Sequence, residues 1–382
     1  MQLSKRRRIR IDSFFLFFFF LRVPIDRYCT SDLNMLSTLR SCALRRPLHK
    51  APASILQHTS TVAPRNLRSK AYSTKMQTYH AVSTYRAWRH SLPPGSTVGV
   101  VPTMGALHAG HISLARAAAT ENTHVVVTIF LNPAQFAPTE DLASYPKTLE
   151  KDLEKLEELN ASLVDKVPGR VAAVFVPTVA EMYPAGIPLV RDQQVGTFVE
   201  VIPLSAKLEG GTRPHFFRGV ATVCTKLFNI TQPNTVYFGQ KDVQQTVIIR
   251  RLLTDLHFDI KLRVIATERE EDGLAMSSRN VYLNGKRREV AITIYRALKA
   301  AEELYESGEK RAEVLLQRAR EVVESAGDAV KLDYVSLNEP QLLEEVEVVE
   351  KGKEVILSAA MWVMPKGEGE GTVRLIDNLI LS

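Results

Sequence analysis

The distribution of apolar and polar residues changes from a strand pattern to a helical pattern within one short stretch. Val98–Val101 is a continuous apolar run, which is typical of a strand buried in a parallel sheet. Pro102 and Gly105 end this run. After Gly110, apolar residues recur every three or four positions, as in an amphipathic helix. Residues 98–119 are therefore predicted to form a strand, a turn and a helix.

The same alternation of strand and helix patterns continues along the chain. Further strands are predicted at His124–Leu131, Val174–Val176 and Lys261–Thr267, helices at Tyr79–His90 and Leu149–Leu159, and another strand, glycine turn and helix from Thr235. The stretch Ser162–Ala173 is interpreted as a small insertion. This alternation predicts an α/β fold with a Rossmann-like, doubly wound parallel sheet, whose ligands bind beyond the carboxyl ends of the strands.

From Asn284 the composition shifts toward Lys, Arg, Glu and Ala. Two helical stretches are predicted near Arg287–Ser307 and Lys310–Ala326, followed by strands at Val330–Leu337, Glu354–Val363 and Val373–Leu381. This succession is typical of a small α+β domain. We therefore predict a Rossmann-like domain at residues 77–284 and a smaller α+β domain at residues 285–382, which has no catalytic constellation of its own.

Charge is distributed unevenly along the 382 residues, whose formal net charge is +7. Residues 1–76 contain 15 Lys and Arg but only 3 Asp and Glu, whereas the remainder contains 34 Lys and Arg and 39 Asp and Glu. The folded part is therefore mildly acidic, which argues against a nucleic-acid-binding surface. Three scattered cysteines, Cys29, Cys42 and Cys224, indicate a reducing compartment.

Residues 1–76 are predicted to be a disordered leader. The apolar run Phe14–Leu21 is shorter than the roughly 20 residues of a bilayer span. From Met35 onward the stretch is rich in Arg and Ser, and no acidic residue occurs between Asp32 and Glu121, which is typical of a mitochondrial presequence. This predicts a mitochondrial matrix protein, and the alternative is an unaddressed N-terminus on a cytoplasmic protein.

His108 and His111 flank the start of the helix predicted after the first strand. Backbone N–H groups at a helix start are unpaired, so this position stabilises a phosphate, and Gly110 lets the phosphate approach closely. Two imidazoles there can donate hydrogen bonds to phosphoryl oxygens. The alternative is that each histidine is a surface or packing residue. A zinc site is disfavoured, because no other His, Cys or Asp accompanies the pair locally.

Two amides follow the predicted strand that starts at His124. Asn132 and Gln135 stand where this strand ends, and an amide can bind a hydroxyl or carboxylate group without contributing charge. This suits a small hydroxy acid. Asn-Pro also commonly just starts a turn, so the pattern alone leaves both interpretations open.

A second strand, glycine turn and helix carries a different set of polar residues. Gly239 permits close approach, Lys241 supplies a positive charge, and Asp242 is either a helix N-cap or a ligand for ribose hydroxyls. Gln245 follows one turn into the helix. Taken alone, a Lys-Asp pair is most often a surface ion pair.

Two loops complete the set of candidate ligand contacts. Ser277, Ser278 and Arg279 form a compact set of donors for a triphosphate, although Ser-Ser-Arg is common in ordinary loops. The segment Glu209–Val220 combines glycines, arginines and aromatic residues, as expected of a lid over a charged ligand.

Residues 102–111, PTMGALHAGH, resemble the His-x-Gly-His signature of the nucleotidyltransferase superfamily in the form found in the pantothenate synthetase (pantoate–β-alanine ligase) family. Three further segments resemble this family in the same order: F-x-N-P-x-Q-F at residues 130–136, G-x-K-D-x-x-Q at 239–245, and Met-Ser-Ser-Arg-Asn at 276–280. The resemblance covers roughly residues 79–382. It departs at His215, which lies one position before the place where relatives commonly have a histidine, and at Gln240, where many have glutamate.

The resemblance implies that ATP and (R)-pantoate form a pantoyl adenylate, which β-alanine then converts to pantothenate and AMP. The implied catalytic residues are His108, His111, Lys241, Ser277, Ser278 and Arg279. The implied ATP contacts are Thr103, Met104, Gly110, His111, Gly239, Lys241, Asp242, Met276, Ser277, Ser278 and Arg279, and the implied pantoate contacts are Asn132, Gln135 and Gln245. Mg²⁺ would be held mainly through the ATP phosphates. Independently of the resemblance, the domain at residues 285–382 is expected to close over the nucleotide at the domain boundary and to form the far wall of the site.

The implied partners are the three small substrates and a second copy of the chain in a homodimer, with no nucleic acid and no stable membrane association. Three alternatives stand against this interpretation. A different nucleotidyltransferase would need a cationic acceptor pocket in place of the amides, and a tRNA-binding relative would need a basic face. A non-catalytic homologue should have lost the histidines or Ser-Ser-Arg, and this chain retains both.

Overall fold

The computed structural model describes residues 75–137, 140, 142–365 and 370–382. The predicted leader, apart from Lys75 and Met76, lies outside the described residues, so the presequence from Met35 stays a prediction. Within the part that is described, no helix is both long and apolar enough to cross a membrane.

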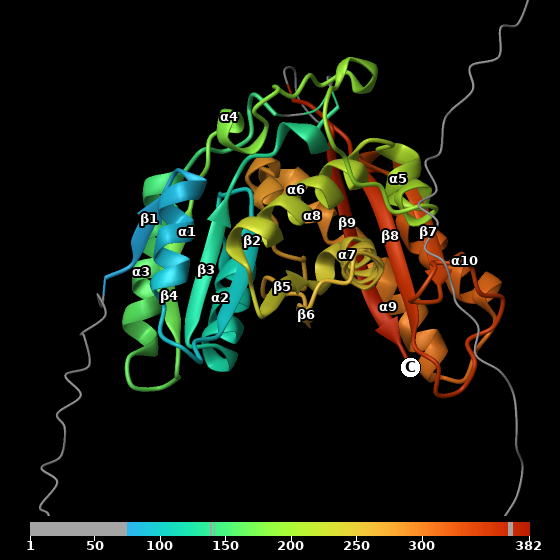
Figure 1. Ribbon diagram of the computed structural model, residues 1–382. Helices are drawn as coiled ribbons and strands as arrows, with labels where there is room; N and C mark the ends of the chain where they lie inside the picture. The colour runs from blue at the N-terminus through green and yellow to red at the C-terminus, as the bar shows by residue number, and fades with distance from the viewer. Residues whose placement is uncertain (1–74, 138–139, 141, 366–369) are drawn as a thin grey trace, which may run out of the picture. The chain divides into compact units, whose positions relative to one another are not determined.

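The central element is a six-stranded, wholly parallel sheet in the order β1-β4-β3-β2-β5-β6 (Figure 1). Its strands are β1 (Gln77–Tyr79), β2 (Val98–Thr103), β3 (His124–Ile129), β4 (Arg170–Phe175), β5 (Thr235–Gly239) and β6 (Lys261–Ile265). The predicted doubly wound α/β fold is confirmed. After the edge strand β1, the chain places β2, β3 and β4 in succession toward that edge and then adds β5 and β6 on the other side of β2. The strand order therefore reverses between β2 and β5. Ligands of such sheets bind at the carboxyl ends of the strands on either side of this point.

Helices cover both faces of the sheet, because the buried strands are apolar on both faces. On one face, Val98 and Val100 pack with residues of α1 (Val82–Ser91), α6 (Phe216–Thr231) and α7 (Val243–Asp255). On the other face, Val101 packs with α2 (Ala109–Glu121) and α3 (Leu149–Leu163). The remaining short elements are α4 (Val179–Met182), α5 (Glu209–Thr212) and the 3₁₀ turns η1 (Pro133–Gln135), η2 (Arg191–Gln193), η3 (Leu204–Ala206), η4 (Gln240–Asp242), η5 (Ser278–Tyr282) and η6 (Gly327–Ala329).

The C-terminal part forms a separate three-stranded antiparallel sheet in the order β7-β8-β9. Its elements are α8 (Gly285–Ala291), α9 (Thr293–Glu306), α10 (Ala312–Glu324), β7 (Val330–Asn338), β8 (Val355–Val363) and β9 (Val373–Leu381), close to the predicted stretches. Leu298, Leu315 and Met361 are fully buried in its own apolar core. The smaller α+β unit is thus confirmed, whereas the proposed domain boundary at residues 284 and 285 stays a prediction.

Two predicted boundaries are wrong. The first helix begins at Val82 because Gln77–Tyr79 instead pairs with β4 as an edge strand. Ser162–Ala173 is no insertion, since it contains the end of α3, a turn and most of β4. The side chain of Asn160 closes this turn by bonding both the N–H and the carbonyl of Val171, at 2.8 Å each.

Candidate active site

A cavity of about 1130 Å³ opens at the carboxyl ends of the central strands and extends to the C-terminal sheet. It brings together every side chain that the sequence placed in the site. These are Thr103, Met104, His108, Gly110, His111, Asn132, Gln135, Gly239, Lys241, Asp242, Gln245, Met276, Ser277, Ser278 and Arg279. They come from the turns after β2, β3 and β5 and from the loop after β6. The roles assigned to these residues stay predictions.

The turn between β2 and α2 is held in shape by a carboxylate that the sequence reasoning missed. Gly105 and Ala106 adopt left-handed conformations, with φ of 90° and 51°. Asp152 of α3, which is 1% exposed, accepts the N–H groups of Ala106 and Leu107 at 2.9 and 2.8 Å. Asp152 lies three residues after Leu149 on the apolar side of a helix whose pattern indicates only scaffolding. An acidic residue on the apolar side of a helix was the signal in the sequence that could have indicated a buried, hydrogen-bonded carboxylate.

His108 and His111 face each other at the start of α2, with ring centroids 4.1 Å apart. His108 is the N-cap, and its Nδ1 accepts the Gly110 N–H at 3.2 Å. His111 Nδ1 in turn accepts the His108 N–H at 3.3 Å. A ring nitrogen that accepts a backbone N–H carries no proton, so in each neutral imidazole the proton sits on Nε2. Both rings therefore present a donor to a ligand while they cap the helix.

The two imidazoles are held in the neutral form. Burial lowers the pKa of His108 to about 4, and the nearby charge of Lys241 adds to this effect. Burial also lowers the pKa of His111 to about 3, with further contributions from His108 and Lys241. The ordinary value is 6.5, so both rings are uncharged donors near neutral pH.

We expect no loss of activity from these imidazoles as the pH passes 6.5, because their native pKa values lie well below it.

The free energy of unfolding should, in contrast, depend on pH in this range. Below pH 6.5 the unfolded chain binds protons that the native histidines do not, so their contribution is present above 6.5 and declines as the pH falls toward about 4. Denaturant unfolding across this range should show the decline, and the double variant His108→Asn, His111→Asn should show less of it. Titration of the His108 or His111 ring near pH 6.5, resolved in nuclear magnetic resonance spectra, would contradict the assignment.

The turn after β5 carries the cationic part of the site. Lys241 Nζ lies 3.6 Å from Asp242 Oδ1, and the Lys241 side chain is 19% exposed. Asp242 occupies the predicted N-cap position of α7, but its side chain makes no capping hydrogen bond. A side chain at Gly239 would meet no atom within 4 Å, so its backbone borders open space in the cavity. This geometry suits the close approach predicted for Gly239.

The two amides after β3 differ in how they are engaged. Asn132 is 1% exposed and donates to Gln135 Oε1 at 3.0 Å and to the Gly219 carbonyl at 3.2 Å. Its Oδ1 accepts the Tyr183 hydroxyl at 2.8 Å. Gln135 contacts the Met104 sulfur through Nε2 at 3.0 Å. Asn132 therefore orients the Gln135 amide, and Gln135 is the more exposed of the two residues, at 7%.

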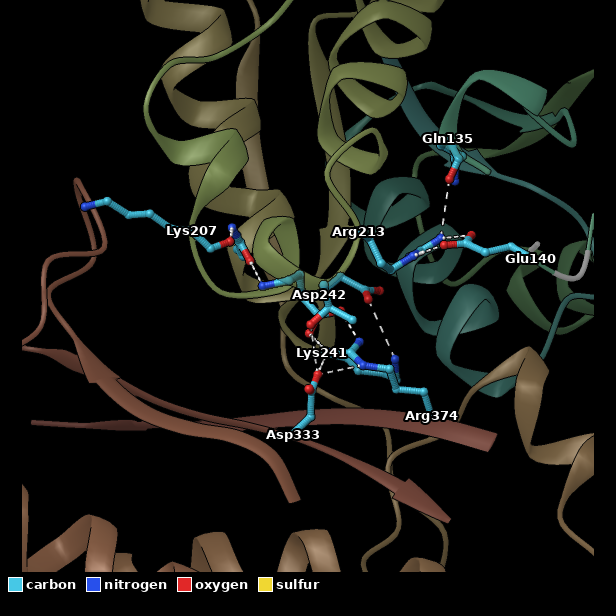
Figure 2. Close-up of polar contacts among 11 residues, drawn as sticks. Gln135, Glu140, Lys207, Arg213, Lys241, Asp242, Asp333 and Arg374 are labelled. Atoms are coloured by element: carbon cyan, nitrogen blue, oxygen red, sulfur yellow. Dashed lines mark hydrogen bonds and ion pairs between the residues drawn. The ribbon is translucent and has the colours of Figure 1, made fainter. Parts of the chain in front are cut away.

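The predicted lid segment links two sides of the cavity (Figure 2). Arg213 donates to both carboxylate oxygens of Glu140 at 2.8 and 2.6 Å and to the Gln135 carbonyl at 3.3 Å. On the other side, Arg374 of β9 pairs with Glu209 and Asp333. These ion pairs connect the segment both to the loop after β3 and to the C-terminal sheet.

Ser277, Ser278 and His215 also lie at the cavity. Ser277 Oγ accepts the Arg279 N–H at 3.3 Å, and Ser278 Oγ lies 2.9 Å from the Tyr145 hydroxyl. His215 also lines the cavity, and its buried Nδ1 has no hydrogen-bond partner among the residues that the structure describes. It is not among the predicted site residues because of its shifted position.

The sequence and the fold match one protein family. A sequence model described as "Pantoate-beta-alanine ligase" matches residues 76–380. A pantothenate synthetase from Roseiflexus castenholzii is 46% identical over 306 residues, which cover 80% of this chain and 99% of the relative. The crystal structure of pantothenate synthetase from Thermus thermophilus matches with a TM-score of 0.67 and 39% identity, covering 80% of this chain and 99% of that one.

A third relative was solved with ligands. It is a pantoate–β-alanine ligase from Francisella tularensis whose structure is described as complexed with β-γ ATP and β-alanine. It matches with a TM-score of 0.60 and 31% identity, covering 80% of this chain and 98% of its own.

Proposed function

The chain belongs to the pantoate–β-alanine ligase family, and on that premise we propose that its cavity joins (R)-pantoate to β-alanine with cleavage of ATP to AMP and pyrophosphate. One observation carries the proposal. The neutral imidazoles, Lys241 and Ser277–Arg279 line the same cavity as the uncharged amides Gln135 and Gln245. Donors for phosphate charge and a binding place for a small hydroxy acid thus share one space.

In the first step, a carboxylate oxygen of pantoate forms a bond to the α-phosphorus of ATP. The bond from that phosphorus to the bridging oxygen breaks, and pyrophosphate leaves with the electron pair. Negative charge builds on the phosphoryl oxygens, and the Nε2 donors of His108 and His111 together with Lys241 stabilise it. Ser277, Ser278 and Arg279 supply further donors from the opposite loop.

In the second step, the amine nitrogen of β-alanine attacks the acyl carbon of pantoyl adenylate. The bond from carbon to the phosphate oxygen breaks, AMP leaves with the electron pair, and the nitrogen releases one proton to solvent as the amide forms. Adenylate is already a good leaving group, so this step needs mainly positioning. Gln135 and Gln245 would hold the pantoyl group in both steps, with Asn132 fixing Gln135.

The remaining nucleotide contacts follow from the same placement. Gly239 leaves room for phosphates, whereas the place of a Cβ at Gly110 is filled by the His108 ring, 2.9 Å away, so Gly110 would contact ATP only through its backbone. The Asp242 carboxylate would bind the ribose hydroxyls, and Thr103, Met104 and Met276 would contact the nucleotide. Mg²⁺ would enter bound to the triphosphate, whose oxygens are its usual ligands, and would neutralise part of the phosphate charge. The part of the chain described by the structure contains no group of three or more His, Cys, Asp or Glu side chains that could hold a metal ion.

The proposed reaction can be tested on the purified full-length chain by measuring pantothenate and AMP together. We expect equal amounts of both products, formed only when ATP, pantoate and β-alanine are all present. AMP formation without pantothenate, or pantothenate formation without AMP, would refute the stoichiometry.

Two finer proposals concern the setting of the reaction. The leader composition supports delivery from Met35 to the mitochondrial matrix, which a fluorescent reporter fused after residues 35–76 would test, with cytoplasmic fluorescence as the contrary result. The family resemblance supports a homodimer. Light scattering should give twice the mass of one chain, and a single-chain mass would contradict it.

A further inference from the structure

Two adjacent residues of β9, Asp377 and Asn378, contact both segments that carry the phosphate-facing groups. Both are buried, at 2% and 1% exposure, although they lie in the C-terminal sheet. A buried carboxylate and a buried amide are costly unless their hydrogen bonds are satisfied. The partners that satisfy them are therefore informative.

Asn378 holds the turn that carries Lys241. Its Nδ2 donates to the carbonyls of Gln240 and Lys241, each at 2.9 Å, and its Oδ1 accepts from Gln240 Nε2 at 3.4 Å. The turn has no side-chain cap of its own, because neither Gly239 nor Asp242 provides one. Both carbonyls accept from the same nitrogen, and the two N–H groups of a side-chain amide can satisfy both of them.

Asp377 holds the segment that leads to Ser277. Arg269 donates to both of its carboxylate oxygens, at 2.6 and 3.0 Å, and to the Gly273 carbonyl at 3.0 Å. Arg269 also bridges to Ala275 in an antiparallel pair and lies 4.3 Å from the centre of the Tyr295 ring. The loop that ends in Met276 and Ser277 is thereby fixed to β9.

The two contacts are coupled, because the Asn378 N–H donates to Asp377 Oδ1 at 2.8 Å. We propose that Asp377 and Asn378 are positioning residues that set the spacing between Lys241 and Ser277–Arg279 across the phosphate site. The inference rests on the proposed function and goes beyond it. It assigns to the C-terminal sheet a part in placing the phosphate-binding groups, whereas the sequence predicted only that this domain closes over the nucleotide and forms the far wall of the site.

The test compares two isosteric changes in the same sheet. Asn378→Asp removes both donors and places carboxylate oxygens against two carbonyls. The matched control is Asn338→Asp in β7, because Asn338 is also 1% exposed and donates to the backbone carbonyl of Leu343, at 3.2 Å. Both changes should lower stability to a similar degree. Pantoate-dependent exchange of pyrophosphate into ATP is then measured on the full chain.

For Asn378→Asp we expect the KM for ATP to rise and the exchange rate to fall, so that the ratio of exchange rate to KM for ATP decreases by at least about tenfold. The KM for pantoate should stay within about twofold of the parent. Asn338→Asp should stay within about twofold in all three quantities. Equal kinetic effects of the two changes, or none for Asn378→Asp, would overturn the inference. Absence of exchange in the parent protein would instead overturn the proposed function.

A double variant shows whether Asn378 acts through Lys241. On a Lys241→Met background, Asn378→Asp should lower exchange by less than about threefold, because the group that it positions is already gone. A full, multiplicative loss would mean that Asn378 acts by another route.

Asp377→Asn should likewise lower exchange about tenfold or more without changing the KM for pantoate, since it removes the charge that holds Arg269. Parent-like exchange in that variant would remove Asp377 from the inference.

Discussion

The variant His111→Asn is expected to lose adenylation by about 10²–10³-fold while its free energy of unfolding changes by less than about 1 kcal/mol. The reason is that the two nitrogens of His111 have separate tasks. Nδ1 accepts the His108 N–H and belongs to the helix cap, whereas Nε2 carries the proton presented to the ligand. The Oδ1 of asparagine can take the place of Nδ1, but no atom of asparagine reaches the place of Nε2.

The matched control is His111→Gln, whose Nε2 amide can reach the place of the imidazole donor. It should retain at least about tenfold more adenylation activity than His111→Asn, at equal or lower stability. Pantoate-dependent exchange and denaturant unfolding measure the two quantities separately. If the losses of activity and stability run in parallel through Asn, Gln and Ala at this position, His111 is a structural residue.

The variant Lys241→Met is expected to lower exchange by about 10²–10³-fold, because it removes a fixed positive charge beside the phosphates from a side chain that is only 19% exposed. Stability should change little, since the ion pair that is lost among the described residues joins Lys241 to the half-exposed Asp242. A second readout is independent of activity. Lys241 lowers the pKa of both His108 and His111, so its removal should raise both pKa values.

Lys207→Met is the matched control for Lys241→Met. Lys207 has a similar side-chain exposure of 23% and pairs with Glu344 at 2.5 Å, away from the described phosphate-facing groups (Figure 2). Its exchange rate should stay within about twofold of the parent. Similar losses in the two lysine variants would indicate a general charge effect, and unchanged imidazole pKa values in Lys241→Met would contradict the proximity of Lys241 to the pair.

The sequence could predict elements whose periodicity is strong and local. β2 and β3 have continuous apolar runs and α2 has apolar residues at helical spacing, and all three elements are confirmed. The edge strand β1 has only three residues, which is too short for any pattern, so the sequence does not separate it from the following helix. The start of β4 was missed because its alanines carry a weak strand signal and only its paired, buried position makes them a strand.

In the candidate site, too, the contacts that are local in sequence could be predicted and the long-range contacts could not. His108, Gly110 and His111 are close in sequence, so their arrangement at a helix start could be predicted. Asp152 and Asn378 act on backbone groups 45 and 137 residues away, respectively, and no local spacing predicts such contacts. Lys241 could be placed after a strand from its sequence, but the amide that fixes its turn comes from another sheet.

In the proposed reaction, pantoate is activated as an adenylate by the groups around His108, His111 and Lys241. The most direct measurement of this activation is the exchange of labelled pyrophosphate into ATP by the purified full-length protein, without β-alanine. We expect exchange that depends strictly on pantoate, because formation of the adenylate is reversible as long as pyrophosphate is present. Pantothenate formation with no pantoate-dependent exchange would contradict the adenylate route.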